Sequence, residues 1–166
     1  MYFNQKDIFW GISKAFAREI MKISVTESHQ DGELLFREGA PAKSFYVLLK
    51  GRVKLSLGEI GQAVYIVSNA GEAFGWSSLI GRENYSASAE VMAPTKLLKF
   101  DREKLQNVLE KDTPNSLILF KRLAEILGNR LLQSYRLISS VSRADISPSY
   151  GTGQVMALML AELEKS

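Results

Sequence analysis

The stretch Gly71-Glu-Ala-Phe-Gly-Trp-Ser-Ser-Leu-Ile-Gly-Arg-Glu-Asn-Tyr-Ser-Ala-Ser-Ala89 carries more information about the fold than any other part of the chain. It combines glycine turns, a short helix start, a polar loop and a run of small residues that enters a strand. Gly75 allows the backbone to approach a bound molecule closely. The amide groups at the start of a short helix over Ser77, Ser78 and Leu79 favour an anion. The stretch therefore predicts a turn, helix and loop that line a small-ligand pocket.

Short apolar runs alternate with turn residues from Glu33 to about Phe100. The segment Val53–Leu57 alternates apolar and polar side chains, which is typical of a half-buried strand. Gly39 and Gly51 separate neighbouring runs, where glycine most easily supplies a positive φ. Short strands at this spacing predict an antiparallel sandwich or barrel. The expected strands are residues 34–36, 45–49, 53–57, 64–67 and 96–100.

Helical patterns flank this region. A short amphipathic helix is predicted over Ser13–Lys22, because its apolar residues recur at helical spacing. Asp101 is the expected N-cap of a second short helix, which ends near Asp112. The longest helical pattern in the chain opens at Pro114 and Asn115.

The long helix carries two apolar stripes. The first repeats as a heptad over about 40 Å of helix, at ~1.5 Å per residue. Its members are Leu117, Phe120, Ala124, Leu127, Leu131, Ser134, Ile138 and Val141. The second stripe, on an adjacent face that packs back onto the barrel, consists of Leu119, Leu123, Ile126 and Leu137. A heptad seam beside a stripe buried on its own domain predicts a helix shared by a symmetric homodimer. The alternative is that both stripes belong to the core of one chain.

The opening stretch resembles the phosphate-binding cassette of cyclic-nucleotide-binding domains, as found in the catabolite-activator (Crp/Fnr) family of bacterial regulators. That cassette reads Phe-Gly-Glu-x-x-Leu, then a short loop, then Arg followed by Ser or Thr and Ala. The same frame is present here as Phe74-Gly75, Leu79 and Ser86-Ala87. Trp76 stands where the family has its ribose-binding glutamate, and Tyr85 stands where it has its phosphate-binding arginine.

The resemblance implies a mainly β fold with flanking helices: a cyclic-nucleotide-binding-like double-stranded β-helix, or jelly roll, with a long C-terminal dimerisation helix. It implies a barrel domain with an N-terminal helix at 1–114, the dimerisation helix at 115–143, and a connector with a short terminal helix at 144–166. In the family that terminal helix leads into a helix-turn-helix. Too few residues follow here for a three-helix DNA-reading unit, so no DNA binding is expected of this chain as it stands.

The resemblance also implies a ligand site. Its expected members are Phe74, Gly75, Trp76, Ser77, Ser78, Leu79, Arg82, Tyr85, Ser86 and Ala87 on the cassette, with Ser134 and Tyr135 on the long helix. A charge-assisted hydrogen bond contributes about 1.5–3 kcal/mol. Losing both the arginine and the glutamate is therefore expected to weaken cAMP or cGMP binding by about 10²- to 10⁴-fold, which moves a micromolar site towards the millimolar range.

Several of these positions leave alternatives open. Arg82 either replaces the missing charge or is an exposed residue at a loop tip. Trp76 and Tyr85 either form a flat aromatic wall for a planar ligand, or Trp76 fills the former ribose space and closes the pocket. Ser134 either contacts the ligand or sets the register of the helix seam.

Composition narrows the classes of function. The absence of cysteine excludes disulfides, thiol nucleophiles, iron–sulfur clusters and thiolate zinc sites. The single histidine, His29, lies in a polar stretch before the first predicted strand. A metal-dependent cupin needs several histidine and carboxylate ligands, so one histidine argues against that class. No apolar run reaches the ~18–20 residues of a membrane span, and the N-terminus lacks a signal-peptide pattern. A cytoplasmic protein without catalytic activity, cofactor or membrane partner is expected.

These observations predict a regulatory module that senses a small anionic or planar effector and relays it through the long helix of a homodimer. Two other functions stay open. One is a scaffold or interaction domain that binds no ligand. The other is a DNA-binding transcription regulator whose DNA-binding domain is absent from this chain. The net charge is +3, and the basic residues of 115–143 form either a solvated outer face or a surface that attracts nucleic acid or an anionic membrane surface.

Overall fold

The computed structural model describes residues 7–58 and 61–141, without the side chains of Gln62 and of residues beyond Arg136. The predictions for residues 144–166, and for the side chains of Leu137, Ile138 and Val141, therefore fall outside the described part. The chain divides into two compact units, Met1–Leu127 and Gly128–Ser166. The sheet and the short helices all belong to the first unit, and the division lies within the long helix.

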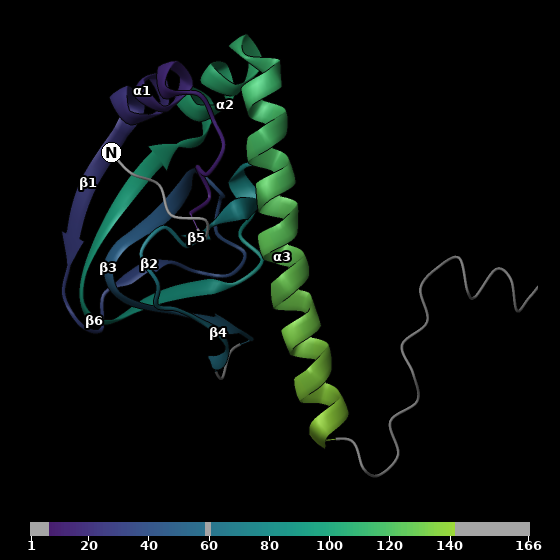
Figure 1. Ribbon diagram of the computed structural model, residues 1–166. Coiled ribbons are helices and arrows are strands. Elements are labelled where there is room, and N and C mark those ends of the chain that lie inside the picture. Colours follow the sequence, from purple (N-terminus) through teal and green to yellow (C-terminus); the bar gives the residue numbers. More distant parts are fainter. Residues whose placement is uncertain (1–6, 59–60, 142–166) are drawn as a thin grey trace, which may run out of the picture. The chain divides into compact units, whose positions relative to one another are not determined.

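Six antiparallel strands form one sheet in the described part of the chain (Figure 1). They are β1 (Ser24–His29), β2 (Leu34–Phe36), β3 (Ser44–Leu57), β4 (Gln62–Val67), β5 (Ala73–Phe74) and β6 (Ser88–Asp101). The long strand β6 pairs with β1, β2 and β3, while β3 also pairs with β4 and β5. The mainly β architecture predicted from the spacing of the apolar runs is confirmed.

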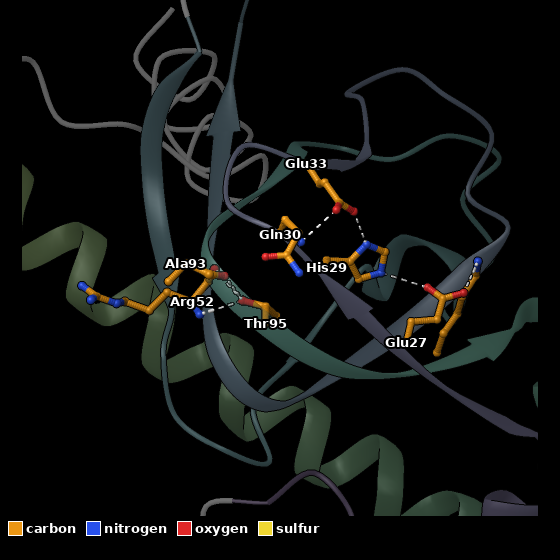
Figure 2. Close-up of polar contacts among 8 residues, drawn as sticks. Glu27, His29, Gln30, Glu33, Arg52, Ala93 and Thr95 are labelled. Carbon is orange, nitrogen blue, oxygen red and sulfur yellow. Dashed lines mark hydrogen bonds and ion pairs between the residues drawn. The ribbon is translucent and has the colours of Figure 1, made fainter.

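β3 runs through two segments that the sequence predicts as separate strands, 45–49 and 53–57. Gly51 lies between them with a φ of 104°. A Cβ on Gly51 would lie 2.7 Å from the Cα of Thr95. The Thr95 hydroxyl donates to the Ala93 carbonyl over 2.7 Å and accepts from the Arg52 amide over 3.1 Å (Figure 2). The strand bends instead of ending, because glycine permits the close approach and threonine satisfies the backbone there.

His29 is the last residue of β1. The expectation that it lies in a polar stretch before the first strand is therefore wrong. β1 pairs with β6 along its whole length, from Ser24 opposite Phe100 to His29 opposite Thr95. It is an edge strand with no fully buried side chain. The sequence therefore shows no apolar run for β1, and β5 is too short to give a pattern.

The helices are α1 (Lys14–Ile23), the short 3₁₀ helix η1 (Trp76–Ser78), α2 (Arg102–Lys111) and α3 (Thr113–Val141). α1 and α2 lie together at one end of the sheet (Figure 1). Ser13 caps α1 by accepting from the Phe16 amide over 3.1 Å, and Asp101 caps α2 by accepting from the Lys104 amide over 3.1 Å. The predicted long helix is present, and no helix among the described residues is long and apolar enough to cross a bilayer.

Both faces of β3 are buried where the strand begins, so that neighbouring side chains enter different cores. Phe45 and Val47 join the helix-side core, which includes residues of α1, α2 and α3. Tyr46 and Leu48 join the roll core, which is enclosed by the strands. Phe74 belongs to the roll core, whereas Trp76 packs against the helix-side core. The segment that follows β5 therefore lies between the two cores.

Candidate functional site

The cassette, defined here as residues 74–87, turns sharply where β5 ends. Gly75 has a φ of 71° in the left-handed region and precedes η1. A Cβ on Gly75 would lie 3.0 Å from the Ser44 carbonyl oxygen and 3.1 Å from Cδ2 of Tyr46. Glycine is therefore required both by the backbone conformation and by the close packing against β3.

Tyr85 follows the polar loop of the cassette and points into the protein, where only 5% of it is exposed. Its hydroxyl donates to the Ser44 carbonyl oxygen over 2.8 Å and accepts from the Ser44 amide over 2.9 Å. Burial raises the pKa of this hydroxyl to about 12, so the side chain is neutral at physiological pH. Tyr85 therefore fastens the cassette to β3 and brings no positive charge to this position.

Four aromatic rings from separate segments stack beside the cassette. The ring centroids of Tyr85 and Phe36 lie 3.8 Å apart with 16° between their planes. Phe36 also stacks on Tyr46 at 5.6 Å, and Tyr46 stacks on Phe74 at 5.1 Å. Stacked rings of this size bury a large, rigid apolar surface. Tyr85 is buried in this stack, so it is not part of the open aromatic wall that the sequence offered as one alternative.

The cassette serines bond to one another and to the backbone. The hydroxyls of Ser77 and Ser86 lie 3.3 Å apart, and the Ser77 hydroxyl also accepts from the Ser86 amide over 3.3 Å. The Ser78 hydroxyl donates to the Gly75 carbonyl over 2.9 Å. Ser77 and Ser78 are both buried. The hydroxyl groups of these three serines are therefore engaged within the cassette itself.

Trp76 and Arg82 come together on the part of the cassette that faces the helix-side core. Trp76 is half-buried and packs against that core, as does Leu79. The Arg82 guanidinium carbon lies 5.9 Å from the centroid of the Trp76 ring. A cation at this distance is attracted to the face of the indole. Trp76 therefore packs on the helix-side core whereas Tyr85 stacks on Phe36 beside the roll core, and the exposed Arg82 lies over the indole ring.

The predicted seam of α3 is exposed over several of its members. Leu117 is 54% exposed, Phe120 is 37% exposed and Leu131 is 50% exposed, and Ala124 is also exposed. Large apolar side chains at this spacing on one helix face are typical of a surface that binds a partner. Leu127 differs, because it packs half-buried against the helix-side core of its own chain.

Three of the four members of the second stripe of α3 pack back onto the barrel as predicted, and the side chain of the fourth, Leu137, lies outside the described residues. Leu119 and Leu123 are buried in the helix-side core, and Ile126 packs against it. Ser134 donates to the Arg130 carbonyl over 3.1 Å, and Tyr135 is 55% exposed. Both of these residues belong to the second compact unit. Their membership of a ligand site with the cassette therefore stays a prediction.

His29 is held between two carboxylates at the end of β1 (Figure 2). Nδ1 lies 2.7 Å from Glu33 and Nε2 lies 3.2 Å from Glu27, which also pairs with Lys99. Hydrogen bonds from the Gln30 amide and from His29 hold the pKa of the Glu33 carboxyl below its usual range. The carboxylates face opposite edges of the ring, so one ion cannot bind all three groups. Among the residues that the structure describes, no acidic, histidine or cysteine cluster suits a metal ion.

The sequence does not single out Ser44 and Tyr46 as neighbours of the cassette. They reach it because β5 pairs with β3, with Phe74 opposite Tyr46. The signal in the sequence is the uninterrupted apolar run at the start of β3, which indicates burial on both faces. It does not reveal which core each side chain enters.

A family model described as Cyclic nucleotide-binding domain matches residues 26–112, which is more than half of the chain. The chain belongs to this family. The match covers the sheet, the cassette and α2, so the resemblance inferred from the cassette frame is confirmed. Trp76 and the buried Tyr85 stand at the family's glutamate and arginine positions according to the resemblance of the cassette, and these two assignments stay a prediction.

Three relatives show what this chain is similar to. The Global nitrogen regulator of Nostoc is 27% identical over 126 residues, which are 74% of this chain and 55% of that protein. The cGMP-dependent 3',5'-cGMP phosphodiesterase A of Dictyostelium discoideum is 24% identical over 96% of this chain, but over only 17% of its own length. The crystal structure of the Thermus thermophilus catabolite activator protein shares the fold with a TM-score of 0.64 and 22% identity, covering 81% of this chain and 62% of that one.

The chain spans less than two thirds of each of these three proteins. What they share with it is the regulatory, cyclic-nucleotide-binding type of domain. The domain is therefore a cyclic nucleotide-binding regulatory domain similar to those of Crp/Fnr regulators.

Proposed function

We propose that this domain is the sensor module of a dimeric, cytoplasmic regulator of the Crp/Fnr type, and that its effector is a small planar or anionic molecule other than cAMP or cGMP. The domain acts by binding and has no catalytic activity of its own. The effector shifts the way in which α3 pairs with its counterpart, as a population shift between two dimer states.

The observation that carries this proposal is the position of Tyr85. A cyclic phosphate needs a cation or several free donors, and Tyr85 is neutral with its hydroxyl bonded twice to Ser44. The serines nearby are engaged with each other and with the backbone. The usual mode of cyclic-nucleotide recognition is therefore unsupported at this cassette.

Trp76 and Arg82 are the residues we assign to the effector. An indole face with a guanidinium 5.9 Å from its centroid offers a planar surface and a positive charge together. A planar molecule that carries a carboxylate or a phosphate matches both. Pairing through α3 is supported by the exposure of Leu117, Phe120 and Leu131, which are large apolar residues on one face of the helix.

Calorimetric titration with cAMP and with cGMP tests the first half of the proposal. We expect no saturable heat from either nucleotide below about 1 mM, given the loss of two charge-assisted contacts. Stoichiometric binding at micromolar concentration would contradict it, and would mean that other groups of the cassette replace the missing pair.

The effector class is tested with a Trp10→Phe variant, which leaves Trp76 as the single tryptophan, since the chain has two. Its fluorescence is followed during titration with 5′-AMP and with orotate, both planar and anionic. Saturable quenching that is lost in Arg82→Gln and kept in the exposed control Lys104→Gln supports the assignment. Quenching that is unaffected by Arg82→Gln contradicts it.

A second candidate function is a scaffold domain that binds no effector. The four stacked rings and the engaged serines favour it, because they leave the cassette complete without a ligand. Dimerisation through α3 together with no response of Trp76 to any probe would support the scaffold over the sensor.

A further inference from the structure

The first residue of α2, Arg102, reaches across to the cassette. Its Nη1 donates to the Arg82 carbonyl oxygen over 2.8 Å, with a longer contact of 3.5 Å to the Ala42 carbonyl. Its own amide donates to the Lys43 carbonyl over 2.9 Å. One residue at the start of α2 thus bonds to the apex of the cassette loop and to the segment beside it.

The segment that Arg102 contacts is already joined to the cassette. The Ala42 amide donates to the Glu83 carbonyl over 2.7 Å, and the Tyr85 amide donates to the Ala40 carbonyl over 2.9 Å. The Gly39 amide in turn donates to the Tyr85 carbonyl over 2.9 Å. Hydrogen bonds therefore join residues 39–43 to residues 82–85, and Arg102 bonds to both segments from the start of α2.

The other end of α2 is fastened to α3. The buried Ser116 hydroxyl of α3 donates to the Leu109 carbonyl of α2 over 2.6 Å. Leu105 and Leu109 of α2 share the helix-side core with Leu119 and Leu123 of α3. A displacement of α2 is therefore transmitted to the beginning of α3.

A groove of about 460 Å³ lies where the cassette, α2 and α3 meet. Its lining includes Leu79 of the cassette, Arg102 and Leu109 of α2, and Ser116 and Phe120 of α3. Packing between α2 and the cassette is thus incomplete on this side. Arg102 lines this groove and also bonds to the Arg82 carbonyl of the cassette.

We propose that Arg102 is the positioning residue that couples the cassette to the pairing helix, by fixing the Arg82 carbonyl to the start of α2. Through this bond the conformation of the cassette and the α2–α3 junction bias each other, and the coupling is reciprocal. The proposal rests on the proposed function, because it names the route by which the Trp76–Arg82 surface acts on α3. An arginine suits the role, since its long side chain carries a permanently charged donor, Nη1, to the Arg82 carbonyl.

Amide hydrogen exchange measured by mass spectrometry on the full chain tests the proposal without any effector. In Arg102→Gln we expect exchange at residues 82–85 to rise about tenfold, as for the loss of one charged hydrogen bond. Arg102→Lys should fall between wild type and Arg102→Gln, because lysine keeps the positive charge on a shorter side chain. Lys104→Gln, which removes an exposed cation from the same helix, should leave residues 82–85 unchanged.

The coupling itself is measured with a second substitution, Ser116→Ala, at the α2–α3 junction. In the wild-type background it should raise exchange at residues 82–85 by about twofold or more, and in the Arg102→Gln background it should add nothing. Three results would overturn the proposal: no change at 82–85 in Arg102→Gln, an equal rise throughout β3 and β6, or an equal effect of Ser116→Ala in both backgrounds. None of these three exchange results depends on dimerisation. A sedimentation experiment that finds no dimer would therefore contradict the proposed function without contradicting the role of Arg102.

Discussion

The Tyr85 hydroxyl and the Ser44 backbone form a reciprocal pair of hydrogen bonds, with Tyr85 donating to the carbonyl over 2.8 Å and accepting from the amide over 2.9 Å. Both residues are buried. The same carbonyl oxygen lies beside Gly75, where an added Cβ would be 3.0 Å from it. Ser44 is therefore the point where both ends of the cassette meet β3.

Replacing Tyr85 by phenylalanine tests how much this pair contributes to stability. The ring keeps its stacking on Phe36, but the Ser44 amide and carbonyl both lose their partner. Leaving buried polar groups unsatisfied costs about 1–3 kcal/mol, and we expect Tyr85→Phe to lower the free energy of unfolding by that amount. Urea denaturation followed by circular dichroism measures it. Tyr135→Phe, at an exposed tyrosine, is the matched control and should change stability by less than about 0.5 kcal/mol.

Two glycines of the cassette separate backbone strain from steric contact. Gly75 and Gly81 have φ angles of 71° and 78°, but a Cβ has close neighbours only at Gly75. Gly81→Ala should cost about 1–2 kcal/mol from the left-handed conformation alone. Gly75→Ala should cost at least about 1 kcal/mol more, because Ser44 and Tyr46 must shift. If the two variants lose equal free energy of unfolding in parallel urea titrations, the packing around Gly75 accommodates the added methyl group without cost.

Local patterns in the sequence suffice for most elements of this fold. The Ser13 and Asp101 caps, the positive φ at Gly51 and the long helix all follow from residues that are close together in the chain. β1 cannot be predicted from local sequence in this way, because this edge strand, with the sequence Ser-Val-Thr-Glu-Ser-His, buries no side chain completely. Its strand conformation depends on pairing with β6, whose residues lie more than sixty positions away.

The candidate site also combines features that the sequence predicts with contacts that it does not. The cassette frame is visible in the sequence, and so is the absence of the family's arginine and glutamate. The burial of Tyr85 is not visible there, because it depends on Phe36 and Ser44, which come from β2 and β3 and contact Tyr85 only in the folded chain. The contact of Arg102 with Arg82 is equally non-local, since no spacing in the sequence connects a helix start to a loop carbonyl.

Acid should weaken the turn between β4 and β5 through Glu72. Burial raises the pKa of its carboxyl, but hydrogen bonds from the Asn69 and Ser68 amides and from the Tyr65 hydroxyl outweigh burial, and the pKa lies below its usual 4.5. A depressed folded-state pKa contributes stability that is present above the unfolded value and is lost as the pH falls through the folded value. We therefore expect wild-type stability to decline below about pH 4.5 more steeply than that of Glu72→Gln. Identical slopes in chemical denaturation between pH 3 and 6 would show that Glu72 does not contribute.

Charge introduced into the exposed seam of α3 should separate the proposed dimer. Phe120→Glu and Leu131→Glu place like charges where two copies of the helix would meet, and both positions are exposed in the single chain, so the fold itself should tolerate them. Leu127 is a poorer choice, because it packs on its own helix-side core and its loss would also destabilise the monomer. Asn129→Glu adds the same charge to the opposite face of α3 and is the control. Sedimentation velocity should show wild type and Asn129→Glu as dimers and the two seam variants as folded monomers. A wild-type monomer at all concentrations, or seam variants that still sediment as dimers, would remove pairing through α3.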